Sequence, residues 1–164
     1  MLTLRKADPK DAALVFALIR ELADYEHLTH EVVATEADIA AELFGPEPRI
    51  FCDIAEWDGV PAGFALWFYN YSTFRGRRGI YLEDLYVRPS HRGRGIGKAL
   101  LANLAGRCAE QGLARFEWAV LDWNAPSIAF YESLGARPLD QWTVYRLTGP
   151  ELDQLGTKQE RGPS

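Results

Sequence analysis

The chain has 164 residues, of which 48% are hydrophobic and 12% aromatic, so we expect one packed globular domain and exclude intrinsic disorder. The net charge of −5 argues against nucleic acid as a partner and would attract a cationic one. Arg5, Lys6 and Asp8 interrupt the start of the chain and no long apolar run follows, so neither a signal peptide nor a transmembrane helix is predicted. Two cysteines, Cys52 and Cys108, lie in strand-like and helix-like segments, which favours reduced thiols and a cytoplasmic location.

Hydrophobic periodicity predicts strands and helices in alternation along the chain. In order, these are a strand at 2–6, a helix at 8–25, a helix at 36–44, strands at 50–57 and 63–71, a strand at 80–87, a helix that ends at Gly112, a strand at 113–121, a helix at 124–134 and a strand at 144–147. The polar residues 156–164 predict a frayed tail. We find no repeat or linker, so a single domain over residues 1–155 is expected.

Capping residues support the predicted helix ends. Thr35 with Asp38 three residues later is an imperfect capping box at the start of the second helix. Asn124 is a good N-cap, with Pro126 in the first helical turn. Gly112 is placed to end the helix that precedes it.

The acids at a helix end, the histidines and a group of aromatic residues are each considered as parts of a functional site. Residues 21–26, ELADYE, place several acids at a helix C-terminus, which is either a solvated face or an acidic lip for a cationic substrate. The three histidines lack partnered spacing, so we interpret them as loop or surface residues and expect no metal site. An aromatic cluster is expected to narrow the substrate pocket; its members are Trp67, Tyr69, Tyr71, Phe74 and Trp123.

Two carboxylates, Glu83 and Asp84, interrupt the apolar strand at 80–87. A charge in a buried strand is costly unless it is paired or used. Each carboxylate therefore indicates either an ion pair with an arginine or a functional group.

A glycine-rich loop, Arg92–Lys98, joins this strand to the next helix. Glycines let the backbone approach a ligand, and the helix start adds free N–H groups and the positive end of the helix dipole, so the loop predicts a pyrophosphate site. It is not a P-loop, because Ala99 follows Lys98 where that motif has Ser or Thr. The glycine spacing also differs from the dinucleotide fingerprint.

The loop resembles the R-x-x-G-x-G/A motif of the GNAT acetyltransferase superfamily, with Arg92, Gly95 and Gly97 at the matching positions. Residues 118–136, WAVLDWNAPSIAFYESLGA, are similar to the second GNAT signature, N-x-x-[SA]-x-x-x-Y-x-x-x-G-[AF]. Within the superfamily, the pieces ELAxYE, YLED, RGxGIG and WNxPSIxFY resemble the diamine branch, the spermidine/spermine and thialysine acetyltransferases. They occur in the same order over residues 19–136.

The resemblance implies the α/β (α+β) GNAT fold. That fold has a mixed, strongly twisted sheet of about six to seven strands with helices on both faces, splayed between the strand at 80–87 and the strand at 115–121. It also implies acetyl-CoA as co-substrate, no metal, and a homodimer. The aromatic residues Trp142 and Tyr145 near the C-terminus are compatible with a dimer interface or with the core.

The same resemblance assigns the site residues. Glu83 would be the general base, directly or through water, and Tyr131 would donate a proton to the leaving sulfur, although its position beside Phe130 also fits a core aromatic. Cofactor contacts are implied for Leu85, Tyr86, Val87, Arg92, Gly93, Arg94, Gly95, Ile96, Gly97, Lys98, Asn124, Ser127 and Tyr131. Substrate contacts are implied for Tyr25, Glu26, Glu83, Asp84 and Trp118.

The expected reaction is acetyl transfer to a primary amine of a small cationic substrate, by direct attack in a ternary complex. Residues 141–143, QWT, lack the glutamates that the polyamine enzyme carries there, which favours a lysine analogue or short diamine over long polyamines. The alternatives are a protein N-terminal or antibiotic acetyltransferase, a non-catalytic acyl-CoA-binding regulator on the same fold, and a nucleotide-binding module.

Overall fold

The structure is a computed structural model that describes residues 1–157. By its internal contacts the chain divides into two compact units, Met1–Leu121 and the part from Asp122 to the C-terminus, and each is described by itself. The expectation of one domain over residues 1–155 stays a prediction.

The first unit contains one five-stranded sheet in the order β1-β2-β3-β4-β5. The strands are β1 (Leu2–Lys6), β2 (Phe51–Trp57), β3 (Val60–Ser72), β4 (Arg77–Val87) and β5 (Phe116–Trp118). Neighbours from β1 to β4 are antiparallel, whereas β4 and β5 are parallel, so the sheet is mixed as predicted. Asp58 and Gly59, both with positive φ (50° and 80°), form the tight turn between β2 and β3.

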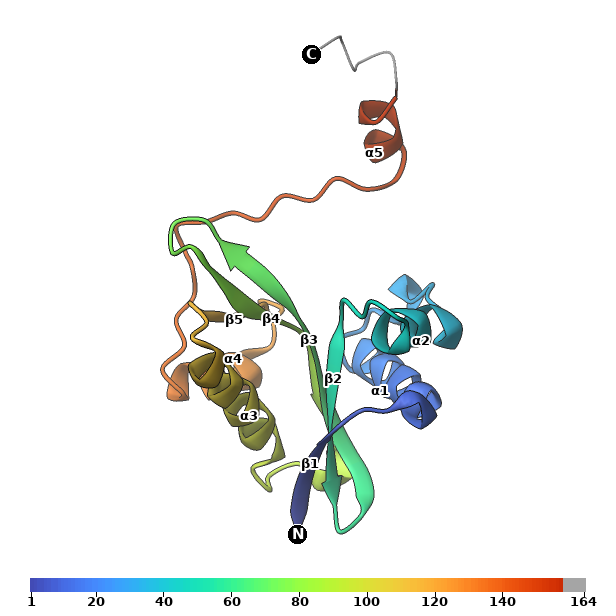
Figure 1. Ribbon diagram of the computed structural model, residues 1–164, viewed down its shortest axis with the longest axis vertical. Helices are drawn as coiled ribbons and strands as arrows, with labels where there is room; N and C mark the ends of the chain where they lie inside the picture. The colour runs from blue at the N-terminus through green and yellow to red at the C-terminus, as the bar shows by residue number, and fades with distance from the viewer. Residues whose placement is uncertain (158–164) are drawn as a thin grey trace. The chain divides into compact units, whose positions relative to one another are not determined.

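Helices cover both faces of this sheet (Figure 1). Helices α1 (Ala12–Tyr25) and α2 (Glu36–Phe44) pack on one face, where Val15, Leu18 and Phe64 are fully buried in the core cluster. Helix α3 (Ile96–Gln111) packs against the other face through Ile96, Leu100 and Leu104. Short 3₁₀ turns lie at Pro9–Asp11, Thr29–Glu31 and Pro89–His91.

Local signals placed these helix ends correctly. The Thr35 side chain accepts a hydrogen bond from Asp38 N (3.2 Å), and Asp38 Oδ2 accepts one from Thr35 N (2.8 Å), so the predicted capping box is complete. Gly112 adopts the left-handed conformation that ends α3.

The second unit contains α4 (Ala125–Ser133) and α5 (Gly149–Leu155). Asn124 caps α4 as predicted. Helix α5 was not predicted, although Pro150 in its first turn and the acidic Glu151 are typical helix-start signals. Of the predicted frayed tail at 156–164, residues 158–164 lie outside the described residues.

Three predictions about strands were wrong. The sheet has five strands rather than six to seven, and β5 is only three residues long rather than spanning 113–121 or 115–121. Residues 144–147 do not form a strand. Strand propensity cannot form a strand without a neighbouring strand to complete the hydrogen-bond ladder, and no described strand pairs with these residues.

Candidate active site

Strands β4 and β5 separate part-way along β4. They pair only at Ile80–Phe116, Tyr81–Glu117 and Leu82–Trp118. Residues 83–87 of β4 therefore have no strand beside them on this side in the described sheet. The predicted splay is confirmed, and one edge of these five residues offers backbone N–H and C=O groups to a ligand.

A β-bulge occurs at the point of separation. Leu66 of β3 pairs with Asp84, whereas its neighbour Trp67 pairs with Leu82, so Glu83 is the extra residue. Directly paired residues of antiparallel strands point to the same face. Asp84 therefore lies on the α1 face with Leu66, and the exposed Glu83 is displaced from the regular alternation.

Three carboxylates influence one another here. Burial, and after it the negative charges of Glu83 and Glu26, raise the pKa of Asp84 to about 7. The pKa of Glu26 is also raised, by burial first and then by Glu83. Within residues 1–157, neither Glu83 nor Asp84 forms an ion pair with an arginine, which removes that interpretation. Carboxylates held together without a counter-charge favour a cationic ligand.

The glycine-rich loop has the backbone that an anion site requires. Gly93 and Gly95 have positive φ (77° and 76°), a conformation that residues with a side chain rarely adopt. Helix α3 begins directly after Gly95 and has no side-chain cap. Its first N–H groups and positive dipole end are therefore available to a phosphate.

Arg92 is anchored to the protein itself. Its guanidinium lies over the rings of Tyr25 (5.0 Å) and Tyr86 (5.6 Å), and its Nε donates to the Val87 carbonyl (2.9 Å). Cation–π contacts of this kind hold the loop against α1 and β4. Arg92 thus connects Tyr25, on the predicted substrate side, to the predicted cofactor loop.

Arg88 was not predicted to matter, yet it ties the end of β4 to α1. Its Nε and Nη2 donate to the two carboxylate oxygens of Glu21 (3.1 and 3.0 Å), and its Nη1 donates to the Pro61 carbonyl (3.1 Å). Such bidentate pairs fix orientation. Of the acids at the end of α1, Glu21 is thus part of the scaffold, whereas Glu26 lies near Glu83 and Asp84. A sequence signal for the pairing is absent, because the two residues are 67 positions apart.

The motif residues of the second unit are organised by α4. Asn124 is buried, and its Oδ1 accepts a hydrogen bond from Ser127 N (3.3 Å) as the N-cap. Tyr131 is half-buried with its ring 5.5 Å from the Phe130 ring. Its carbonyl accepts from the N–H groups of Leu134 and Ala136 at the helix end. The cofactor and proton-transfer roles of these residues stay predictions.

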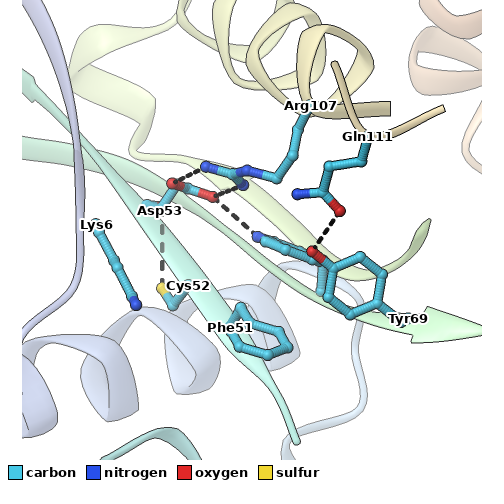
Figure 2. A pocket seen from close by; sticks show the side chains of 8 residues that line it. Lys6, Phe51, Cys52, Asp53, Tyr69, Arg107 and Gln111 are labelled. Atoms are coloured by element: carbon cyan, nitrogen blue, oxygen red, sulfur yellow. Dashed lines mark hydrogen bonds and ion pairs between the residues drawn. The ribbon is translucent and has the colours of Figure 1, made fainter. Parts of the chain in front are cut away.

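The aromatic cluster does not surround this site. Trp67 and Tyr69 line a separate pocket of about 200 Å³, together with Lys6, Phe51, Cys52, Asp53, Arg107 and Gln111 (Figure 2). Tyr71 is 58% exposed and Phe74 is fully exposed, so the predicted narrow aromatic pocket was wrong. Trp67, Tyr69 and Tyr71 are spaced by two residues and therefore share one face of β3, where Arg107 of α3 lies over Trp67, and the turn after β3 places Phe74 in solvent.

Figure 2 shows why this second pocket has a structural role. The buried Asp53 carboxylate accepts hydrogen bonds from Arg107 (3.1 and 3.4 Å) and from Trp67 Nε1 (2.9 Å). A buried charge needs such partners, and these three residues fasten α3 to β2 and β3. No residue of either GNAT motif lines the pocket.

Residues 1–157 contain no group of three or more His, Cys, Asp or Glu side chains placed to hold a metal ion. None of the helices formed by these residues is both long and apolar enough to cross a membrane.

The profile of the Acetyltransferase (GNAT) family matches residues 14–136, which include the splayed strands, the glycine-rich loop and α4. This chain belongs to the GNAT family. It is an N-acetyltransferase, and relatives of the diamine branch confirm the predicted subgroup.

Among the relatives, thialysine N-epsilon-acetyltransferase of Sus scrofa is 37% identical over 166 residues, which cover 94% of this chain and 97% of the relative. L-ornithine N5-acetyltransferase of Arabidopsis thaliana is 32% identical, and the match covers 93% of this chain and 86% of the relative. An integron cassette protein from the mobile metagenome of V. cholerae has a TM-score of 0.79 at 26% identity, and the match covers 96% of this chain and 98% of that protein. An aminoglycoside acetyltransferase from a soil metagenome has a TM-score of 0.75 at 16% identity, and the match covers 90% of this chain and 95% of that protein. At this low identity the similarity shows the shared fold alone.

Proposed function

We propose that this GNAT enzyme transfers an acetyl group from acetyl-CoA to a primary amine of a small cationic substrate, by direct attack in a ternary complex. One observation carries the proposal. The unpaired stretch 83–87 of β4 leads from the bulge beside Glu26, Glu83 and Asp84 to the loop at the uncapped start of α3. A single strand segment thereby joins an environment suited to an ammonium group to one suited to a pyrophosphate.

The proposed cofactor site follows this segment. Acetyl-CoA supplies an activated acetyl thioester. The N–H groups of residues 93–98 and the Lys98 ammonium suit its pyrophosphate, and the unpaired backbone at 85–87 suits the amide groups of its pantetheine arm. The Leu85 N–H would polarise the thioester carbonyl. Backbone groups alternate along β4, and because Arg88 N donates to Ala62 O of β3, the groups of Tyr86 also face β3, whereas those of Leu85 and Val87 face the open edge. Arg92 already donates to the Val87 carbonyl, so the pantetheine pairing would depend mainly on Leu85. The match to the second motif assigns Asn124 and Ser127 to the same cofactor.

Two residues would move protons. An alkyl ammonium has a pKa of about 10, so a proton must leave as the nitrogen attacks. Glu83, exposed at the bulge, accepts it directly or through water. The new N–C bond forms, the C–S bond breaks, and the thiolate takes a proton from the Tyr131 hydroxyl. The amine thus loses one proton to Glu83 and the leaving thiol gains one from Tyr131.

We infer that the substrate carries its amine on a short chain. The curated relatives are named for thialysine and L-ornithine. The shared field of Glu26, Glu83 and Asp84, in a chain of net charge −5, favours such a cation. The absence of acids at residues 141–143 favours a lysine analogue or short diamine over spermine.

A substrate panel tests the proposal. Acetyl transfer would be measured for thialysine, ornithine, lysine, 1,3-diaminopropane, spermine, an aminoglycoside and a peptide with a free N-terminus. We expect the highest kcat/KM for a short amine, and a mock purification without this chain excludes contaminating activity. Preferred acetylation of the peptide or the aminoglycoside would replace the proposed substrate class. Tight acetyl-CoA binding without transfer to any amine would identify a regulator instead.

We also propose a cytoplasmic location. Cys52 and Cys108 are both free thiols, as expected in a reducing compartment. A disulfide in the protein isolated from its cells under alkylating conditions would contradict this.

A further inference from the structure

The pocket drawn in Figure 2, here called the α3 pocket, lies apart from the proposed active site. Lys6 of β1, Asp53 of β2, and Arg107 and Gln111 near the end of α3 contribute to its lining. Helix α3 is 16 residues long, so this end is about 22 Å from the glycine-rich loop at its start. No residue of β4 lines the pocket. A ligand bound there would therefore occupy a second site.

The side of α3 that faces the sheet changes from apolar to polar along the helix. Ile96, Leu100 and Leu104 are buried against the strands, and Arg107 and Gln111 take the next positions towards the sheet. The strands opposite them are polar as well, because Lys6 and Asp53 are paired on β1 and β2 and so share a face. Apolar side chains would extend the core here, whereas these side chains leave a space of about 200 Å³. A concave space with a few polar groups is typical of a ligand site.

One wall of the α3 pocket is aromatic. The Phe51 and Trp67 rings are stacked with their centroids 4.8 Å apart, and the Tyr69 ring meets them edge-on at 5.6 and 5.2 Å. Two guanidinium groups lie on this wall, Arg107 over Trp67 (4.9 Å) and Arg78 over Tyr69 (4.4 Å). Flat rings with cations beside them suit a ligand that is itself a ring and carries negative charge.

The polar side chains of the α3 pocket offer donors, because their acceptors are already used. Both carboxylate oxygens of Asp53 accept hydrogen bonds from Arg107 or Trp67, and Gln111 Oε1 accepts one from the Tyr69 hydroxyl (2.9 Å). Two of the five N–H groups of Arg107 serve Asp53, which leaves three. The Lys6 ammonium and the Gln111 amide N–H groups add further donors, and within residues 1–157 Lys6 forms no ion pair. A site that only donates requires a ligand that accepts.

Charge and size narrow the ligand class. Lys6 and Arg107 stand against one acid, Asp53, so the lining has one positive charge in excess, although the whole chain has a net charge of −5. That excess favours a monoanion. A cavity of about 150 Å³ admits a benzene ring. The α3 pocket of about 200 Å³ therefore has room for one ring with a carboxylate.

We propose that the α3 pocket binds a small aromatic carboxylate. Its ring lies on the wall formed by Phe51 and Tyr69, and its carboxylate accepts hydrogen bonds from Lys6 and Arg107. Asp53 holds the Arg107 guanidinium in place for this contact, as Figure 2 shows, so the pair that fastens α3 to the sheet also builds the site. The proposal does not depend on the proposed acetyl transfer, because binding alone tests it.

Benzoate, a minimal aromatic carboxylate, is the probe for the first test. The Trp67 indole N–H donates to Asp53 inside the pocket, so its resonance in the ¹⁵N spectrum of the full chain reports on this place. Trp67→Phe assigns this resonance among those of the five tryptophans. We expect a saturable shift with a Kd of about 1 mM or tighter, the affinity of an ordinary ligand with about ten non-hydrogen atoms. Saturating acetyl-CoA should leave this Kd unchanged.

Matched ligands and variants show which groups bind the probe. Acetate lacks the ring and benzylamine carries a positive charge, so each should bind about tenfold more weakly or less. Lys6→Gln should weaken benzoate binding about fivefold or more, and Gln111→Trp should abolish it by filling the pocket. Lys10→Gln and Glu110→Trp are the controls, because both residues are exposed outside the pocket, and they should bind benzoate normally. The dispersion of each spectrum shows that the variant is folded.

Four results would overturn the proposal. The first is a Trp67 resonance that does not move up to about 10 mM benzoate. The second is equal binding of acetate or benzylamine, which would remove the need for a ring or for negative charge. The third is a folded Gln111→Trp variant that binds as tightly as Glu110→Trp. The fourth is displacement of benzoate by acetyl-CoA, which would place the probe in the proposed cofactor site.

Discussion

Removing the charge of Asp84 should stabilise the protein at alkaline pH. Burial, Glu83 and Glu26 raise the pKa of this carboxyl from 3.8 to about 7. In the unfolded chain the group keeps its ordinary pKa, so the folded state holds the proton more tightly. Below pH 3.8 the carboxyl is protonated in both the folded and the unfolded state, so it does not lower the free energy of unfolding. As the pH rises from 3.8 to 7 the folded state loses stability, and the full cost applies above pH 7.

The magnitude follows from the shift. Each pKa unit corresponds to about 1.4 kcal/mol, so a shift of about three units gives an upper value of about 4 kcal/mol. Asp84→Asn keeps the shape and removes the charge. We expect it to raise the free energy of unfolding by about 2–4 kcal/mol at pH 8, and by progressively less towards pH 4.

Urea unfolding at pH 4.5, 6 and 8 measures this difference. Glu151→Gln is the control, because it removes one acid from an exposed position in α5 and should leave the pH dependence unchanged. A variant Asp84→Asn that is less stable than the wild type at pH 8, or equally stabilised at all three pH values, would refute the reasoning.

Two further predictions concern the proposed site, and a third concerns the scaffold that holds it. Gly97→Glu should weaken acetyl-CoA binding, measured by calorimetry, at least tenfold. Gly106→Glu, in open space on the same helix, is the control and should leave the affinity unchanged. Equal affinities of the two variants would show that the loop is not part of the cofactor site. Tyr131→Phe should lower kcat by roughly ten- to a thousandfold at every pH from about 6.5 to 10 with binding intact, whereas the deficit of Glu83→Gln should shrink as the pH rises and more amine is already deprotonated. A Glu83→Gln deficit that is constant over this range would make Glu83 a binding residue, and a fully active Tyr131→Phe would make the phenol a packing group. Arg88→Met should lower the free energy of unfolding in urea by about 1–3 kcal/mol, because Glu21 loses its partner. The exposed Arg49→Met is the control and should change it little. Equal effects would show that the Arg88–Glu21 pair does not stabilise the fold.

Local features of the fold could be predicted from the sequence alone. The capping box of Thr35 and Asp38, the positive-φ turn at Asp58-Gly59 and the glycine end of α3 each depend on residues within a few positions of one another. The glycine-rich loop and the N-cap of α4 are also local, and together they led to the GNAT family through two motifs at a fixed spacing. Because these interactions are short-range, the residues that form them can be recognised without knowing which distant residues lie nearby.

The tertiary structure decided what depends on partners far apart in the chain. It placed the bulge at Glu83, paired Arg88 with Glu21 across 67 positions and Asp53 with Arg107 across 54, and separated Trp67 and Tyr69 from the active site. It also left residues 144–147 without the strand that their propensity predicts. The energy of a strand, a buried charge or an aromatic contact depends on what lies across from it, and a single sequence does not specify those neighbours.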